Sequence, residues 1–591
     1  MLVPEHFKRV VVEDFEFIPD VPHYRPVCGV FHELRSGETT RLWGDQLGDK
    51  PPYPMGPDSL IVGYNLEAEL KVHRALGWPM PACCADLYFE FRHRTSGLSG
   101  WPPKRSRKLL DAAAFYGLPC IDAVEKQEMR DRILKGPPYS KEERQAIISY
   151  CDSDVRLEFR LLQVMAPDFR WPYVVYRGRY AAALALTDLI GTPLDRGLLE
   201  RFQLNRETIL DRLIAEIDKD YGVFDGRTFK QDWFAQYLSR VNIPWPATAS
   251  GQLNLDDDTF EDMSETYPQL KPLRHLRQNL AGLRKGEIAI DKDGRNRGFL
   301  NPFGSSTGRN QPRECIWLMP AWLRGLVKPP EGYALVHLDY GGQEIGCAGS
   351  LSRDQNMMDA YKSEDAYLWF AKKGELVPPE ATRRTHNAER SLYKIAFLGI
   401  NYGIGPESLG LRINRSELFA RHLIGLHHDL FPDYWRWSNR AVDHAMLFGW
   451  QSTMFDWIYR LAPNPRPTAL RNFPIQSSGA EMLRLGHCLA TERGIQVCCP
   501  IHDAYVIQTP LEILDQEILR MRSCMAEASR VVVRGFELFT DVKVIRYPDR
   551  YRSSKGEAMW NLVMRLLEEI ETETESQTAS PVNTSTMPVA T

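Results

Sequence analysis

Two aspartates follow apolar segments that lie far apart in the sequence. Asp339 ends the apolar run that starts at Tyr333, and Asp503 stands beside His502 between two apolar, β-rich runs. The second pattern is typical of a hairpin with the acid at its turn. Two carboxylates on adjacent strands can hold a pair of divalent cations, an arrangement that serves phosphoryl transfer. We therefore expect the two acids to meet on neighbouring strands.

The segment between the two acids predicts a helix with one functional face. Arg390, Lys394, Leu398 and Tyr402 follow one another at four-residue steps, so their side chains share one face. A face that is cationic at one end and apolar at the other can hold a triphosphate and a base. An Arg-x3-Lys pair alone is more often an exposed stripe. Its place between two metal-binding acids is what favours a nucleotide polymerase.

The N-terminal third carries a second group of acids. Asp14 and Glu16 are two residues apart in a β-branched strand, so they point to the same side. Glu69 lies in a helix that follows another strand, and Tyr150 and Asp154 are one helical turn apart. Four acids from three elements around a tyrosine can bind two cations and direct a water at a phosphodiester.

Three segments resemble the motifs of a known family. The strings HLDYGGQE (337–344), RSLYKIAFLGINYG (390–403) and IHDAYVI (501–507) are similar to motifs A, B and C of the family A DNA polymerases, the group that includes bacterial DNA polymerase I. Ser306–Arg309 resembles the TGR segment that precedes motif A, and Arg471–Gln476 resembles a palm helix segment that touches the growing duplex. Their common order and spacing make the resemblance specific.

This resemblance implies a two-metal polymerase that acts on primer-template DNA and dNTPs. Asp339 and Asp503 would hold two Mg²⁺ ions, with the backbone carbonyl of Tyr340 beside them. Arg390 and Lys394 would neutralise the triphosphate, whose charge moves onto the leaving group in the transition state. Replication accessory proteins are a further class of partner that the resemblance implies.

The remaining polymerase residues would select the nucleotide. Leu398 and Tyr402 would cover the incoming base and sugar, and Glu344 would close the pocket against a 2′-hydroxyl. His502 would lie near the primer terminus. The residues that would read minor-groove acceptors common to all base pairs are Arg309, Asn472 and Gln476.

The N-terminal acids resemble the three motifs of an RNase H-like 3′–5′ proofreading exonuclease, which precedes the polymerase in this family. The resemblance implies Asp14, Glu16, Glu69 and Asp154 as ligands of two further Mg²⁺ ions, with Tyr150 as a catalytic group. The family usually has aspartate at the position of Glu69. Asp86 is a nearby substitute candidate.

Several positions depart from the family pattern. Ala504 stands where the family usually has a second acid after Asp503, so the metal site has one carboxylate fewer. Leu398 replaces the aromatic residue of the best-known members, and Thr468 occupies a position usually held by arginine. These departures favour a divergent enzyme, and we expect a bacteriophage polymerase.

The expected fold is a multidomain chain of α/β and α+β units, an RNase H-like exonuclease domain followed by a right-hand polymerase. The segment 186–217 is strongly helical in pattern and would start the polymerase body. The predicted division is a 3′–5′ exonuclease-like domain at 1–165, an entry segment and thumb at 166–300, a first palm segment at 301–370, fingers at 371–454, a second palm segment at 455–574 and a disordered tail at 575–591.

The composition is compatible with these assignments. The chain has 591 residues, 43% hydrophobic and 25% charged, which leaves room for several domains. Its net charge of −4 shows no basic bias, so DNA contact must rest on local patches. No apolar run approaches membrane-spanning length and the N-terminus does not resemble a signal peptide. We expect no membrane partner and a cytoplasmic location, the host cytoplasm for a phage enzyme.

Other functions remain open from the sequence. Ala504 leaves room for a 3′–5′ exonuclease with a weakened polymerase half. A polymerase specialised for modified dNTPs, such as 2-aminoadenine, would carry the same motifs. Glu344 and the nuclease-like acids argue against a single-subunit RNA polymerase, and the density of metal-site acids argues against a non-enzymatic DNA-binding protein.

Overall fold

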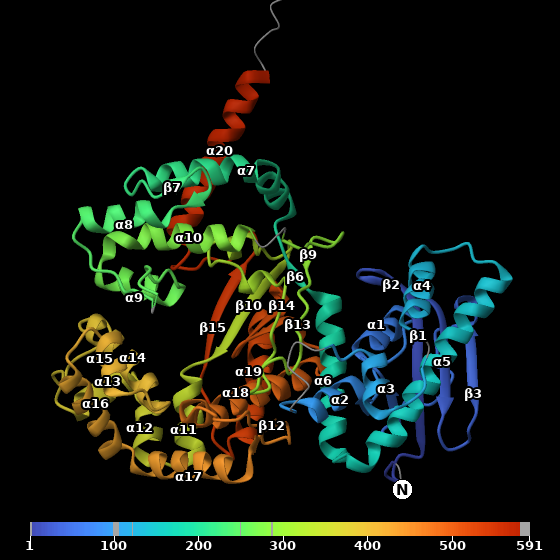
Figure 1. Ribbon diagram of the computed structural model, residues 1–591. Coiled ribbons are helices and arrows are strands. Elements are labelled where there is room, and N and C mark those ends of the chain that lie inside the picture. The colour runs from blue at the N-terminus through green and yellow to red at the C-terminus, as the bar shows by residue number, and fades with distance from the viewer. Residues whose placement is uncertain (1–2, 99–105, 121, 249, 285–287, 579–591) are drawn as a thin grey trace, which may run out of the picture.

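The chain begins with a mixed five-stranded sheet of order β3-β2-β1-β4-β5, as the computed structural model shows (Figure 1). The structure describes residues 3–98, 106–120, 122–248, 250–284 and 288–578. β1 pairs antiparallel with β2 and parallel with β4. The strands are β1 (Arg9–Asp20), β2 (His23–Glu33), β3 (Thr39–Trp43), β4 (Ser59–Gly63) and β5 (Cys84–Asp86).

Helices cover both faces of this sheet. Val10 and Val12 of β1 are fully buried and pack in one core with Ile147 and Cys151 of α5. Because side chains alternate along a strand, Asp14 and Glu16 continue this face toward α5. The helices of this region are α1 (Glu67–Ala75), α2 (Leu87–Thr95), α3 (Leu109–Tyr116), α4 (Ala123–Leu134) and α5 (Lys141–Met165).

The segment 186–217, which is strongly helical in pattern, is divided between two helices, α6 (Trp171–Ile190) and α7 (Arg196–Asp218). Gly191 ends α6 with φ +64° and ψ 171°, and β6 (Thr192–Pro193) pairs with β9 (Arg295–Asn296). The helical pattern of 186–217 is interrupted here, because a residue before proline avoids the helical region. Pro193 was the signal for this break.

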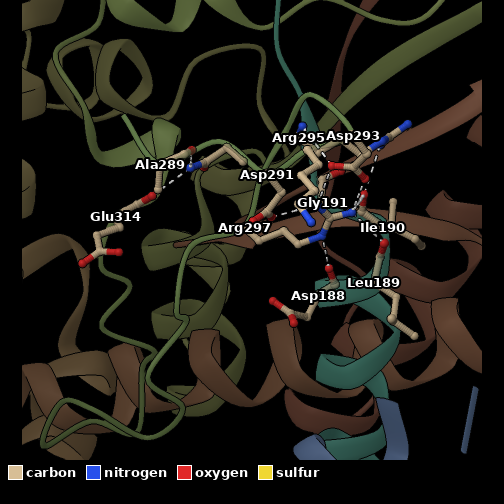
Figure 2. A network of polar contacts seen from close by, with 12 residues as sticks. Asp188, Leu189, Ile190, Gly191, Ala289, Asp291, Asp293, Arg295, Arg297 and Glu314 are labelled. Carbon is tan, nitrogen blue, oxygen red and sulfur yellow. Dashed lines mark hydrogen bonds and ion pairs between the residues drawn. The ribbon is translucent and has the colours of Figure 1, made fainter. Parts of the chain in front are cut away.

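Two arginines satisfy the open carbonyl end of α6. Arg297 donates from Nε to the carbonyl of Asp188 at 2.6 Å and from Nη2 to that of Leu189 at 3.0 Å. Arg295 donates to the carbonyls of Ile190 and Gly191 at 3.2 and 3.1 Å, and Figure 2 shows the guanidinium groups converging on this helix end. The last carbonyls of a helix lack intrahelical partners. These contacts therefore fix the end of α6 to β9 and the residues that follow it.

A helical group lies above the second sheet in Figure 1 and contains much of the segment in which the sequence analysis expects the thumb, so we call it the thumb-like helices. It contains α7 and, from the other end of the chain, α20, which are joined by ion pairs of Arg201 with Glu571 and Arg212 with Glu573. The second palm segment was predicted to run to residue 574, but α20, which begins at Glu557, packs with this helical group instead. The remaining elements are β7 (Phe224–Asp225), β8 (Thr228–Phe229), α8 (Gln231–Arg240), α9 (Asp257–Thr266), α10 (Lys271–Arg284) and α20 (Glu557–Thr578).

The tail prediction is partly wrong. Residues 575–578 are the last turn of α20 rather than disordered chain, since the helix runs to Thr578. Residues 579–591 lie outside the described residues.

The second sheet has the order β13-β14-β10-β15 and is antiparallel throughout. Leu338 and Tyr505 face α18 and α19, whereas Leu335 and Val506 face the core of the thumb-like helices. The elements are β10 (Tyr333–Tyr340), β13 (Gln496–Ile501), β14 (Ala504–Pro510), β15 (Thr540–Arg546), α18 (Pro467–Glu492) and α19 (Leu514–Val532).

A further helical group lies across the second sheet from the thumb-like helices, in yellow and orange in Figure 1, at the position expected for the fingers. No helix of the described residues is long and apolar enough to cross a membrane. The elements of this group and of its connection to α18 are α11 (Gln343–Ser352), α12 (Gln355–Lys362), α13 (Ala366–Lys373), α14 (Asn387–Asn401), α15 (Pro406–Arg412), α16 (Glu417–Leu430), α17 (Pro432–Phe448), β11 (Trp450–Ser452) and β12 (Ile458–Arg460).

Candidate active site

The two predicted metal-binding aspartates meet at one end of the second sheet. Asp339 lies near the end of β10, and Asp503 lies in the β13–β14 turn, where its carbonyl accepts a hydrogen bond from Tyr340 N at 3.1 Å. Burial and the charges of Asp503 and Asp541 raise the pKa of Asp339 to about 6. Burial also raises the pKa of Asp503. Crowded, partly buried carboxylates of this kind suit a divalent cation, which prefers oxygen ligands and relieves their repulsion.

The turn residues take the conformation that the hairpin needs. His502 has φ +52°, in the left-handed region, and it directly precedes Asp503. Partial burial of the ring lowers the pKa of His502. Tyr340 turns its side chain into the core, where its hydroxyl donates to the carbonyl of Met525 at 2.9 Å. Only the backbone of Tyr340 can serve the site.

Glu344, Tyr402 and Gln476 lie together beside the two aspartates. Gln476 donates from Nε2 to Glu344 Oε1 at 2.6 Å and to the Tyr402 hydroxyl at 3.1 Å. Burial and the neighbouring Glu344 raise the pKa of Tyr402. Leu398, one turn earlier in α14, is half-buried against the same core. The structure thus brings the predicted sugar and base residues together from three elements.

Arg390 and Lys394 line a cavity of about 640 Å³ between α14 and the end of β10. The Arg390 guanidinium pairs with Asp365 and lies 5.2 Å from the centre of the Tyr367 ring, which also faces Lys394 at 5.9 Å. The sequence analysis missed Asp365 and Tyr367. Asp365 caps α13 by accepting from the N–H groups of Tyr367 and Leu368, and the N-cap pattern before an apolar run was a signal for it.

The predicted minor-groove residues border the same site. Arg309 donates to Gln343 Oε1 at 3.4 Å, and its positive charge partly opposes the burial that raises the pKa of Asp503. Asn472 lies one turn before Gln476 on α18, and its buried Oδ1 has no hydrogen-bond partner in the described part of the chain. Arg309 and Asn472 therefore keep polar groups available beside the aspartates.

A second acidic site lies in the N-terminal region. The carboxylates of Asp14, Glu16 and Asp154 offer ligand atoms within 4.8 Å of one another, and they form the one such trio found among the described residues. Burial, and next the charge of Asp154, raise the pKa of Asp14 to about 7. Burial and Asp14 raise the pKa of Glu16. The trio is the hard-oxygen set that Mg²⁺ prefers.

Glu69 and Asp86 do not join this trio. Glu69 is buried behind Asp14, and its Oε2 accepts a hydrogen bond from Phe15 N at 2.8 Å. Asp86 as a substitute ligand was wrong, because its carboxylate accepts from Asn65 N and Leu66 N at 3.2 and 3.1 Å and caps α2. A capping acid with these backbone partners has a structural task.

Two neighbours of the trio were missed from the sequence. Lys126 of α4 pairs with Asp154 and lies 5.2 Å from the centre of the Tyr150 ring. Burial alone would lower the pKa of Lys126, but Asp154 raises it above its ordinary value. Glu158 is 1% exposed with an unpartnered Oε2, and burial together with Asp14 raises its pKa. The four-residue step from Asp154 was the signal for Glu158.

Comparison with known proteins gives a family match for the second sheet and the helices around it. Residues 319–544 match the family model of DNA polymerase family A. This segment is similar to the family A DNA polymerases. It contains both Asp339 and Asp503, and it contains α14 with its cationic face. The strings 337–344, 390–403 and 501–507 and the segment 471–476 lie inside the matched segment, whereas Ser306–Arg309 precedes it.

The wider comparisons extend beyond this matched segment. DNA polymerase I of Aquifex aeolicus is 24% identical over 511 residues, 80% of this chain and 85% of that protein. DNA polymerase I of Chloroflexus aurantiacus is 23% identical over 424 residues, which are 64% of this chain. The match spans only 44% of the Chloroflexus protein.

One solved structure shares the fold of nearly the whole chain. The polymerase domain of Pol1 from M. smegmatis, in complex with DNA primer-template and dNTP, superimposes with a TM-score of 0.67. The match covers 92% of this chain and 96% of that one at 18% sequence identity. Because the identity is low, this likeness concerns the fold, and function has to be argued from the site.

Proposed function

We propose that this chain is a template-directed DNA polymerase that adds dNTPs to a primer 3′ end. The observation that carries the proposal is the meeting of Asp339 and Asp503 on adjacent parts of one sheet inside the family A domain. These two residues would hold two Mg²⁺ ions. When bound, the ions activate the primer hydroxyl and neutralise the triphosphate.

The substrate enters from the side of α14. Arg390 and Lys394 line the cavity of about 640 Å³ and bind the triphosphate, for which Arg390 exchanges the Asp365 carboxylate for a phosphate oxygen. Both cations lie where negative charge grows in the transition state, so they assist the chemical step as well as binding. Primer-template DNA and a dNTP bound to the solved structural relative support this choice of substrates.

Glu344 selects the deoxyribose. Its carboxylate accepts from Gln476 Nε2 at 2.6 Å and lies beside Tyr402, so it cannot swing away without breaking these contacts. A 2′-hydroxyl would have to enter the space that this carboxylate fills. The hydrogen bond from Gln476 supports a fixed gate rather than a mobile one.

We also propose 3′–5′ proofreading at the N-terminal site. Asp14, Glu16 and Asp154 would hold the metal ions, and Tyr150, one helical turn before Asp154 on α5, would orient the attacking water. Glu69 would act behind Asp14 through the Phe15 N–H instead of binding metal itself. An exonuclease with a weakened polymerase half is the second candidate, and Ala504 favours it.

The divergent motifs support viral DNA replication as the biological setting, with accessory proteins as partners. Leu398 and Ala504 are two of the positions that depart from the family pattern. Specialisation for a modified base such as 2-aminoadenine would show as a preference in steady-state incorporation of the modified dNTP over dATP opposite thymine. Equal efficiency for the two nucleotides would contradict such specialisation.

The polymerase proposal is tested by primer extension with purified protein. Extension should require Mg²⁺, a template strand and complementary dNTPs, and EDTA should stop it. Lys394→Ala should raise the KM for dNTP and lower kcat together, because the ammonium serves binding and chemistry. Protein that binds primer-template but adds no nucleotide under any metal condition would contradict the proposal.

A further inference from the structure

The acid missing from the β13–β14 hairpin has a counterpart on the neighbouring strand. In the register of the second sheet, Asp339 is directly opposite Ala504 of β14 on one side and Asp541 of β15 on the other. Directly opposed residues of antiparallel strands point to the same face and lie about 4.5–5.5 Å apart at Cα. Ala504, Asp339 and Asp541 therefore form one row across the sheet, with an acid at its centre and at one end.

The carboxylate of Asp541 leans toward the end of β10 that carries the site. A methyl group built on Gly341 would lie 3.2 Å from Asp541 Oδ2. Asp541 is exposed, and its side chain makes no hydrogen bond or ion pair within the described residues. Nothing in the described fold uses this charge.

The surroundings of Asp541 also suggest why a cation belongs there. Asp541 and Gly341 line the same cavity of about 640 Å³ as Arg383, Arg390 and Lys394. An unpaired carboxylate on the wall of a triphosphate site repels the substrate unless a cation lies between them. Asp365, another acid that lines this cavity, forms an ion pair with Arg390. Asp541 has no such partner among the described residues.

We propose that Asp541 is an auxiliary carboxylate of the polymerase metal pair and takes the place of the acid that Ala504 lacks. The inference rests on the proposed polymerase function. Among the described residues, the carboxylate oxygens of Asp339, Asp503 and Asp541 do not all lie within 4.8 Å of one another, as those of the N-terminal trio do. It therefore contributes negative charge beside the cations rather than a principal ligand. Loss of such a supporting group typically lowers metal affinity about 10- to 100-fold.

The test measures the Mg²⁺ dependence of primer extension. Asp541→Asn should raise the Mg²⁺ concentration for half-maximal extension about 10-fold, with much of the rate recovered at saturating Mg²⁺. Asp541→Glu should stay close to the wild type. Asp549→Asn is the control, because Asp549 is an exposed acid in the turn after β15 and lies outside the row.

A second measurement does not depend on activity. In a chain whose N-terminal trio is disabled by Asp14→Ala and Glu16→Ala, Mn²⁺ binding followed by electron paramagnetic resonance should weaken when Asp541→Asn is added. Ala504→Glu in the Asp541→Asn chain should restore tight Mn²⁺ binding and the low Mg²⁺ requirement, since position 504 lies in the same row.

The outcomes separate the inference from the polymerase proposal. A wild-type chain that extends primers, together with an Asp541→Asn chain of unchanged Mg²⁺ requirement and Mn²⁺ affinity, would overturn the role of Asp541 alone. If Ala504→Glu fails to rescue a folded Asp541→Asn chain, the proposal that Asp541 takes the place of an acid at position 504 is contradicted. A wild-type chain that never extends a primer would instead overturn the proposed function.

Discussion

At the scale of single residues, the site is held by contacts between segments that are distant in the sequence. The motif residues Glu344, Tyr402 and Gln476 could each be predicted from a string, but their mutual hydrogen bonds could not. Asp541 and Lys126 belong to no motif string, and only strand register or helix packing brings them to the acids. Sequence patterns identify residues that repeat a known spacing, whereas partners from other elements require the fold.

Glu344→Ala should admit ribonucleotides, because it removes the carboxylate that Gln476 holds in place. Discrimination of this kind is worth roughly 10²-fold or more. The measurement is the ratio of rNTP to dNTP incorporation efficiency in single-turnover primer extension. Arg353→Ala, at the far end of α11, is the control. An unchanged ratio in the Glu344 variant would place the gate elsewhere.

Leu398→Tyr should raise the use of dideoxynucleotides. The leucine offers no polar atom to the sugar, whereas a tyrosine hydroxyl can take the place of the missing 3′-hydroxyl. Leu398 is half-buried one turn before Tyr402, so part of the introduced tyrosine ring can extend into open space. Single-turnover incorporation of ddNTP and dNTP by both proteins gives the ratio. If the ratio stays the same, Leu398 does not face the sugar and the assigned register of α14 fails.

Lys126→Met should tighten divalent metal binding at the N-terminal trio. The ammonium is paired with Asp154 and its raised pKa keeps it charged, so it repels a cation that approaches the carboxylates. Mn²⁺ titration of a chain carrying Asp339→Ala and Asp503→Ala isolates this site. Lys135→Met, an exposed lysine at the end of the same helix, should change nothing. Weaker binding in the Lys126 variant would show that the lysine organises the site instead.

At the scale of elements, strands and helices near the motifs were predicted well. β1, β4, the β13–β14 hairpin and α14 appear where apolar alternation or four-residue spacing indicated them. The break between α6 and α7 was missed, because the apolar pattern continued across it. The row of 504, 339 and 541 could not be predicted either, since the pairing of β15 with β10 depends on a connection through the whole of α19.

Gly191→Ala should destabilise the fold at the break between α6 and α7. Gly191 has φ +64° and ψ 171°, a region open almost only to glycine, and an added Cβ would lie 2.9 Å from Arg297 Cγ. We expect a loss of roughly 1–3 kcal/mol in the free energy of unfolding, measured by urea denaturation. Gly425→Ala, in the exposed helix α16 with open space around it, should be neutral or stabilising. Equal effects of the two changes would contradict this account of the break.

At the scale of the whole molecule, the two acidic sites belong to separate cores. The trio of Asp14, Glu16 and Asp154 lies on the first sheet, and Asp339 and Asp503 lie on the second, with α6 packed against elements of both. The division into two regions was predictable because each carries its own ordered set of acids. The packing of α20 on α7 was not, since contacts between chain ends leave no local pattern. Two separate sites predict two separable activities.

The reciprocal loss of these activities tests the central claim most directly. Asp503→Ala should abolish Mg²⁺-dependent primer extension by at least about 10²-fold, as the loss of a metal-site group does, and leave degradation of single-stranded DNA unchanged. Asp14→Ala with Glu16→Ala should abolish degradation and leave extension. Both activities are measured on the same labelled primer with and without template. Near-normal extension by the Asp503→Ala chain would contradict the assignment of the polymerase site.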